Sequence, residues 1–273
     1  TGGTILFADT NDSIATADRI RIVSGTGPGK SNNGQGNNSS GSSGDGSLSL
    51  GSLRARDIEL QAGGTITAQD LTASGARIHI QGDGGDIQLG RVDAAHTGPT
   101  DGSVDINISN TGTGAVTTSQ IEASANVASS NSSHVSVYVQ TEDGNIRTEN
   151  LNISSRNSTG GASAYLDLRS TNGQVDTAAV VVSVEAQGGA AQGQLNLVSD
   201  SVGVNSQNLA LTVRNDALDS GSAYGDMVIS AGGQADLGSV LLTVDSAVDQ
   251  RAYGNLSAQA FGGTLTLAGA DLQ

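Results

Sequence analysis

The sequence VYVQTEDGNIRTENLNI, residues 137–153, alternates apolar and polar side chains in short runs. Its apolar positions are Val137, Val139, Ile146, Leu151 and Ile153. Successive side chains of a β-strand point to opposite faces, so a period of two predicts strands with one buried face. Gly144 separates the first run from the second. The stretch therefore predicts three short strands joined by tight turns.

The same pattern returns along most of the chain, each time around a glycine. The repeated glycines are Gly64, Gly85, Gly114, Gly144, Gly173, Gly203, Gly233 and Gly263. Their spacings are 21, 29, 30, 29, 30, 30 and 30 residues. An apolar residue follows two positions after each glycine, and another follows seven positions after it. A nearly constant period of this length indicates a repeat architecture in which each unit forms one coil.

Three strands and three turns in each repeat predict a triangular coil. Stacked coils would form three parallel sheets whose strands lie roughly 4.8 Å apart. We therefore expect an all-β fold, a parallel β-helix (β-solenoid) of about nine coils of 21–30 residues. The general preference of parallel crossovers predicts a right-handed β-helix. Glycine suits the turn because a sharp corner often needs a positive φ.

The longer repeats exceed the 21-residue repeat by about eight residues, which follow the third strand. These insertions are rich in Ser, Asn, Gly and Asp, a composition typical of loops. They cover residues 96–102, 126–134, 155–161, 187–193, 215–225 and 247–254. Because they occupy the same place in each repeat, we expect all of these loops on one edge of the β-helix.

The N-terminal part of the chain is less regular. Residues 10–24 are similar to residues 141–155, so a coil is expected there. Residues 25–46 are rich in Gly, Ser and Asn, and we interpret them as a flexible insertion. Residues 48–53 indicate a further coil whose register the pattern does not place. We expect residues 1–273 to form a single β-helix segment of a longer protein, because neither end carries the cap that solenoids usually have.

The composition excludes several classes of protein. The chain has 27 acidic and 12 basic residues, a formal net charge of −15, and Lys30 is its single lysine. No nucleic-acid partner is expected, because phosphate binding needs clustered Lys and Arg. The absence of cysteine excludes disulfides and thiolate metal sites. No apolar run approaches the ~20 residues that a membrane-spanning helix needs, so no membrane-spanning segment is expected.

The parallel β-helix also occurs in polysaccharide-cleaving enzymes of the pectate-lyase and polygalacturonase type. A hydrolase of this kind needs two carboxylates roughly 5–9.5 Å apart. The chain contains no Asp-Asp pair, and His79, His96 and His134 are far apart in sequence. We interpret the three histidines as solvated surface residues. The prediction is no catalytic residues and no enzyme, with a polysaccharide lyase or hydrolase as the alternative.

The tyrosines have a regular position in their repeats. Tyr138, Tyr165, Tyr224 and Tyr253 precede the repeated glycines by 6, 8, 9 and 10 residues. Tyr138 lies between two inward-facing valines, so its ring is expected to face outward. A column of exposed aromatic rings in a shallow polar groove can stack on sugars, so we predict that these four residues bind carbohydrate. The alternative is that the rings cover apolar gaps under the loops.

Acidic residues gather near several turns. They are Asp83, Asp86, Glu142, Asp143, Asp216, Asp219 and Asp226. Carboxylates and turn carbonyls suit Ca²⁺, and GDGGDIQLG at residues 82–90 weakly resembles a glycine-rich calcium repeat. The motif occurs once, and the turn propensity of Asp and Gly explains it as well. We therefore predict no metal site and no cofactor, with Ca²⁺ as the alternative.

Two segments indicate a family. GGTITAQDLTASGARIHIQGDGGDIQLGRV, residues 63–92, and TEDGNIRTENLNIS, residues 141–154, resemble the repeats of filamentous-haemagglutinin-like adhesins, which include biofilm matrix adhesins. The resemblance implies two-partner secretion through an outer-membrane transporter of a Gram-negative bacterium. It also implies a location at the cell surface or in the extracellular matrix. No catalytic motif is carried over from this family.

These observations predict a rod-like segment of a secreted bacterial adhesin. It would mediate cell–cell, surface or biofilm-matrix attachment, with extracellular polysaccharide or surface glycans as partners. Many weak contacts along a rod can add up to strong attachment. Two alternatives stay open: a polysaccharide-degrading β-helix enzyme, and a structural stalk that binds nothing and only sets reach.

Overall fold

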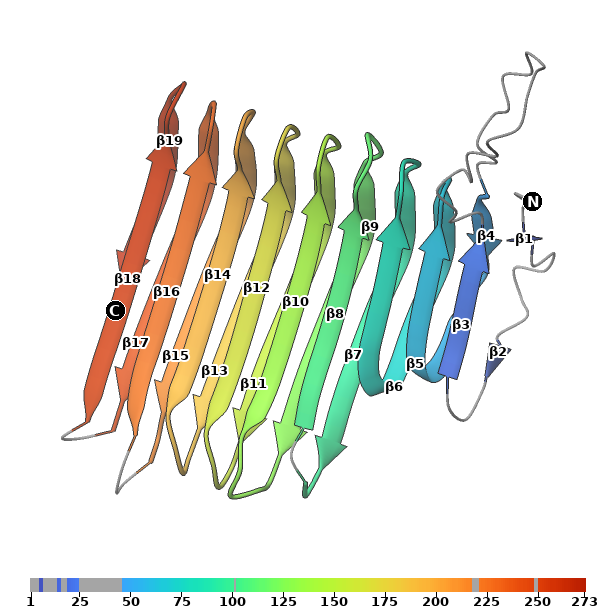
Figure 1. Ribbon diagram of the computed structural model, residues 1–273. Coiled ribbons are helices and arrows are strands. Elements are labelled where there is room, and N and C mark those ends of the chain that lie inside the picture. Colours follow the sequence, from blue (N-terminus) through green and yellow to red (C-terminus); the bar gives the residue numbers. More distant parts are fainter. Residues whose placement is uncertain are drawn as a thin grey trace, which may run out of the picture.

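The computed structural model describes residues 5–6, 14–15, 19–24, 46–100, 102–217, 221–247 and 250–273. The regular secondary structure in these ranges consists of β-strands, and no helix occurs among the described residues. The strands pair in parallel and stack into one rod of about seven turns (Figure 1). The expected all-β parallel β-solenoid is therefore confirmed. The expected number of about nine coils is slightly too high.

Two layers of strands run along most of the rod, and Figure 1 shows them running in opposite directions. The even-strand layer contains β8 (Gly102–Asn110), β10 (Ser133–Thr141), β12 (Ala162–Ser170), β14 (Ala191–Ser199), β16 (Ser222–Ala231) and β18 (Arg251–Ala260). The odd-strand layer contains β7 (Ile87–Gly98), β9 (Val116–Val127), β11 (Ile146–Asn157), β13 (Val175–Ala186), β15 (Val204–Asn215), β17 (Ala235–Ser246) and β19 (Leu265–Leu272). Each strand pairs with the strand two places later in the chain, so residues about one repeat apart become neighbours.

The strands of the odd-strand layer are bent. The pairing of β11 with β9 and β13 omits Glu149, and both Glu149 and Asn150 are exposed. Two exposed residues in succession interrupt the alternation, which marks a corner in the strand. The two short strands that the sequence predicts after each glycine therefore exist as two arms of one bent strand.

From Gly85 onward the repeated glycines lie in the tight turns between an even strand and the next odd strand, whereas Gly64 lies in the turn between β5 (Leu53–Ala62) and β6 (Ile66–Gly82). A Cβ on Gly144 would lie 2.0 Å from the carbonyl oxygen of Gly114, and a Cβ on Gly173 would lie 2.0 Å from that of Gly144. Gly221 is the only described glycine with a positive φ. The expectation that these glycines supply a positive φ is therefore wrong. They are needed because successive coils approach too closely at the corner for any side chain.

Buried polar side chains close the same turns. The inward row that ends the even strands contains Asn110, Thr141, Ser170 and Ser199. Ser170 Oγ donates a hydrogen bond to the carbonyl of Gly144 at 2.7 Å and accepts one from the N–H of Gly173 at 2.8 Å. Ser199 Oγ likewise donates to the carbonyl of Gly173. These side chains satisfy backbone groups that the turn would otherwise bury without partners.

From β7 onward the longer loops connect each odd strand to the next even strand, and Figure 1 shows them on the edge opposite the tight turns. The expectation that the insertions share one edge is confirmed. The loops are shorter than predicted, because the strands continue into the inserted residues. Residues 155–157, for example, belong to β11.

The 21-residue repeat needs no loop. Its residues form one strand, β6 (Ile66–Gly82), which pairs first with β7 and then with β8. The change of partner occurs at Ala76, which has a φ of 83° and is the only described residue other than glycine with a positive φ. A single left-handed residue thus turns the chain where later coils use a loop.

The N-terminal strands are β1 (Ile5–Leu6), β2 (Ile14–Ala15), β3 (Arg19–Ser24), β4 (Leu48–Leu50) and β5 (Leu53–Ala62). Both β2 and β3 pair with β5, which confirms a coil in the described part of residues 10–24. Leu48 pairs with Ile66, so the corner glycine of this coil is Gly46, whose carbonyl accepts a hydrogen bond from the N–H of Gly64 at 3.1 Å. Residues 25–45 of the expected insertion lie outside the described residues.

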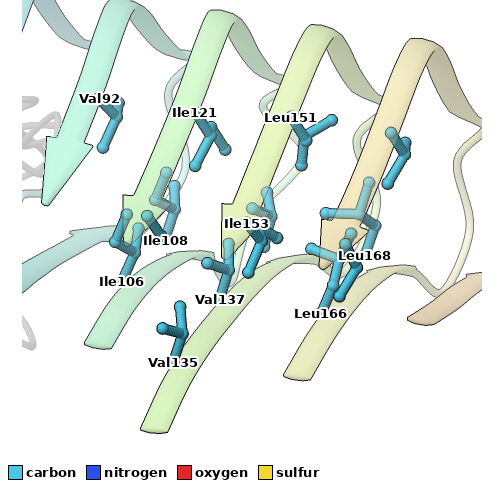
Figure 2. Close-up of a cluster of buried hydrophobic side chains, with 14 of the residues drawn as sticks. Val92, Ile106, Ile108, Ile121, Val135, Val137, Leu151, Ile153, Leu166 and Leu168 are labelled. Carbon is cyan, nitrogen blue, oxygen red and sulfur yellow. The ribbon is translucent and has the colours of Figure 1, made fainter. Parts of the chain in front are cut away.

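The core lies between the two layers and consists of rows of aliphatic side chains. Figure 2 shows two facing rows, Val92, Ile121 and Leu151 in one and Ile106, Val137 and Leu166 in the other. Each side chain of this kind contributes roughly 1.5–3 kcal/mol when it is fully buried. The period-two pattern therefore places rows of apolar side chains on the inner face of each layer and leaves the outer face polar.

Candidate functional site

The four tyrosines lie on the outer face of the even-strand layer. Tyr138 is on β10, Tyr165 on β12, Tyr224 on β16 and Tyr253 on β18. The two valines that flank Tyr138 are fully buried, which confirms that its ring faces outward. The intervening strand β14 carries no tyrosine, so the structure divides the predicted column into two pairs.

The two pairs differ in geometry. Tyr224 and Tyr253 are direct partners on adjacent strands, and their rings stack with centroids 5.3 Å apart and planes 7° apart. Tyr138 instead pairs with Asp167, so Tyr165 is its diagonal neighbour. The rings of Tyr138 and Tyr165 also lie 5.3 Å apart but are tilted by 38°. Tyr224 and Tyr253 are the more exposed pair, at 42% and 49% of their surface.

A groove of about 740 Å³ runs along this face from His134 on β10 to β18, and it is lined by Tyr165, Tyr224 and Tyr253 but not by Tyr138. The register of the strands places its lining in two outward rows. One row contains His134, Ser163, Gln192, Tyr224 and Tyr253, and the other contains Tyr165, Gln194, Asp226 and Asn255. Because each row crosses successive strands, the groove follows the long axis of the rod.

The floor of the groove is the row between these two, which reads Ala164, Gly193, Gly225 and Gly254. A Cβ on Gly193 would lie 2.6 Å from Val213 Cγ2, and a Cβ on Gly225 would lie 2.6 Å from Val244 Cγ2. Side chains of the odd-strand layer therefore fill the space beneath the floor. Glycine allows the two layers to approach here, which lowers the outer surface between the rows of larger side chains.

The glycine floor was not predicted from the sequence. The available signal was the replacement of an inward apolar residue by glycine in successive repeats, from Val135 and Ala164 to Gly193, Gly225 and Gly254. A glycine inside a strand pattern often marks a close approach of backbone.

Polar groups line the groove beside the rings. Asn196 Nδ2 donates a hydrogen bond to Tyr165 Oη at 3.2 Å, and Asn255 Nδ2 donates to Asp226 Oδ1 at 2.7 Å. His134 Nδ1 and Ser163 Oγ are hydrogen-bonded at 2.8 Å. The described lining residues include one carboxylate, Asp226, and neither lysine nor arginine. The groove can therefore offer ring faces, amides and hydroxyls to a ligand.

The phenols of the first pair are held in their neutral form. Burial raises the pKa of Tyr138, and the nearby Tyr165 and Asp105 raise it further. Burial is also the main cause of the raised pKa of Tyr165, which Asp167 raises further while the hydrogen bond from Asn196 lowers it. Burial likewise raises the pKa of Asp167, against the opposing charge of Arg169.

The histidines do not share one environment. His134 is exposed at the edge of the groove, and His79 lies on the outer face of β6 between two buried isoleucines. His96 occupies an inward position paired with the buried Ala125, and its Nε2 is buried without a partner among the described residues. The interpretation of all three as solvated surface residues is therefore wrong for His96.

The acidic residues at the turns act as hydrogen-bond acceptors. Asp86 Oδ1 accepts from the N–H of Ala115 at 2.8 Å, and Asp143 Oδ1 accepts from Asn172 Nδ2 at 2.6 Å. Asp216 is paired with Arg214, whereas Asp226 lies in the groove, and Asp219 lies outside the described residues. In the described part of the chain, no group of three or more His, Cys, Asp or Glu could hold a metal ion. Ca²⁺ stays an alternative that the turn geometry does not assign to a site.

A second, shallower groove of about 700 Å³ follows the bend of the odd-strand layer. Its polar groups bond to one another: Asp176 accepts hydrogen bonds from Gln174 and Asn205 and lies 3.7 Å from Arg147. It contains no aromatic ring among its described lining residues. The groove between the tyrosines is therefore the stronger candidate for a binding site.

Comparison of the chain with protein-family models, with curated proteins and with solved structures gives no match. Within the described ranges, no helix has the length and apolar character needed to cross a membrane.

Proposed function

We propose that this chain is a rod-like segment of a secreted bacterial surface adhesin that attaches to extracellular polysaccharide or surface glycans. The observation that carries the proposal is the groove lined by Tyr165, Tyr224 and Tyr253, which runs along the rod and combines exposed ring faces with amides. Aromatic rings present an apolar face to sugar rings, while amide and hydroxyl groups bond to sugar hydroxyls.

The β-solenoid itself supports a mechanical role. The parallel β-solenoid is compatible with filamentous-haemagglutinin-like adhesins, to whose repeats residues 63–92 and 141–154 are similar. In this proposal the protein leaves the cell through an outer-membrane transporter by two-partner secretion and acts at the cell surface or in the biofilm matrix. A stiff rod holds weak binding sites away from the cell. Once one site on a fibre has bound, the effective concentration of ligand at the other sites of that fibre rises.

The groove favours binding over cleavage. Glycoside hydrolysis generally uses two carboxylates on either side of the scissile bond. Asp226 is the one carboxylate among the described residues that line the groove, and it accepts a hydrogen bond from Asn255. This lining supports a non-enzymatic role for the groove.

The test is a glycan array and matrix-polysaccharide binding assay, with product analysis of the same mixtures. The wild type is compared with the double variant Tyr224→Ala/Tyr253→Ala, and Phe261→Ala serves as the control, because Phe261 is 73% exposed and does not line the groove. We expect binding without cleavage, lost in the double variant and kept in Phe261→Ala. Cleavage products would indicate an enzyme, and absence of binding would indicate a stalk.

A further inference from the structure

The geometry points to one ligand class and one orientation for the groove. We propose that it binds a linear polysaccharide without negative charge, neutral or amine-bearing, whose chain lies parallel to the rod axis. This inference rests on the proposed function of the same groove.

The orientation follows from the arrangement of the rings. Tyr165 on β12 stands toward one end of the groove, and the stacked pair Tyr224 and Tyr253 on β16 and β18 stands at the other. The strands from β12 to β18 span about 15 Å at a spacing of roughly 4.8 Å. A chain that crossed the rod would meet one ring site, whereas a chain along the groove meets both.

Strand β14, which lies between the two aromatic sites, carries polar side chains in the middle of the groove. Gln192 and Gln194 of β14 stand on opposite walls of the groove, with Gly193 between them in the floor. The floor between the two amides carries no outward side chain, and the amides can donate to and accept from the hydroxyls of a sugar chain. The result is an aromatic site, an amide site and a second aromatic site in line.

The charge of the groove selects against acidic chains. Asp226 lies in one wall, and Asp167 raises the pKa of the Tyr165 phenol at the N-terminal end of the groove. Asp226 also raises the pKa of Tyr165, so its carboxylate acts on the same site. With no lysine or arginine among the described lining residues, a uronate or sulfate group would meet like charge without a compensating partner.

The first experiment tests the ligand class. Wild-type protein is screened by calorimetry against neutral glucan and mannan oligomers, chitosan oligomers, and polygalacturonate and alginate oligomers. The best neutral probe is then oxidised at its primary hydroxyls to carboxylates. We expect oxidation to weaken binding by about tenfold or more, and Asp226→Asn to reduce that penalty.

Tightest binding of polygalacturonate or alginate, or equal binding of the oxidised probe, would overturn the inference while leaving the proposed function in place. If the protein binds none of the oligomers in the screen, both this inference and the proposed function are overturned.

The second experiment tests the orientation with the best probe in a series of increasing length. We expect affinity to rise with length until the oligomer spans about 15 Å and then to level off. Tyr165→Ala and Tyr253→Ala should each weaken binding of long oligomers by about tenfold. A disaccharide should be sensitive to only one of the two substitutions.

Affinity that is independent of length, or long oligomers that respond to only one substitution, would exclude a chain along the rod. Circular dichroism during thermal unfolding shows whether each variant keeps its fold, and Phe261→Ala again serves as the control.

Discussion

The Cα of Gly144 stands so close to Gly114 that a Cβ there would lie 2.0 Å from the carbonyl oxygen of Gly114 in the preceding coil. The nearest atom is backbone, so no side chain can move away to make space. We expect Gly144→Ala to lower the free energy of unfolding by about 1–3 kcal/mol, measured by urea denaturation. Gly269→Ala is the matched control, since a Cβ there meets nothing within 4 Å. Equal stability of the two variants would contradict the stacking argument.

The second prediction concerns the buried hydroxyl of Ser170, which bonds to both Gly144 and Gly173. Ser170→Ala leaves a carbonyl and an N–H without this partner inside the corner. We expect a loss of about 1–3 kcal/mol in the free energy of unfolding. Ser154→Ala, on the outer face of β11, should change stability by less than about 0.5 kcal/mol. A Ser170→Ala variant as stable as the wild type would show that the corner does not depend on this hydroxyl.

The third prediction uses two threonines in one inward row. Thr148 Oγ1 is buried without a hydrogen-bond partner within the described structure, whereas Thr177 Oγ1 donates to Ser206 Oγ at 2.7 Å. Valine has nearly the same shape and removes the hydroxyl. We expect Thr148→Val to raise the free energy of unfolding by about 1 kcal/mol and Thr177→Val to lower it by a similar amount. The same sign for both substitutions, in chemical denaturation, would contradict this prediction.

The fourth prediction concerns the dependence of stability on pH at Asp167. Burial raises the pKa of this carboxyl, so between its ordinary value of 3.8 and the raised value the folded state binds more protons than the unfolded state. Stability from this group is therefore present at low pH and lost as the pH rises through the raised pKa. We expect Asp167→Asn to be more stable than the wild type at neutral pH.

The difference between Asp167→Asn and the wild type should disappear below the ordinary pKa, where the carboxyl is neutral in both states. Thermal unfolding of the two proteins across the acid range measures it. A difference in stability that does not change with pH would mean that the substitution acts through packing or hydrogen bonding.

Local sequence was sufficient for the elements and their stacking. The alternation in residues 137–153 predicts strands because side-chain direction depends only on neighbouring residues. The period between glycines then predicts parallel coils, and the constant position of the insertions places the loops on one edge. The outward direction of Tyr138 follows from the same alternation.

Local sequence did not determine the register between neighbouring strands. The pattern did not place the register of the coil before Gly64, and the pairing of Leu48 with Ile66 makes Gly46 its corner glycine. His96 appeared to be a loop residue, but β7 continues through it and turns its ring inward.

By itself, the sequence determined an all-β rod of repeated coils with outward-facing tyrosines, because these properties depend on the order of apolar and polar residues along the chain. Only the tertiary structure decided that the tyrosines form two pairs, that the corner glycines are required by the close approach of successive coils, and that Gly193 and Gly225 form the floor of a groove. Each of these depends on contacts between residues about 30 positions apart or between the two layers. Such contacts exist only after the coils have stacked in register.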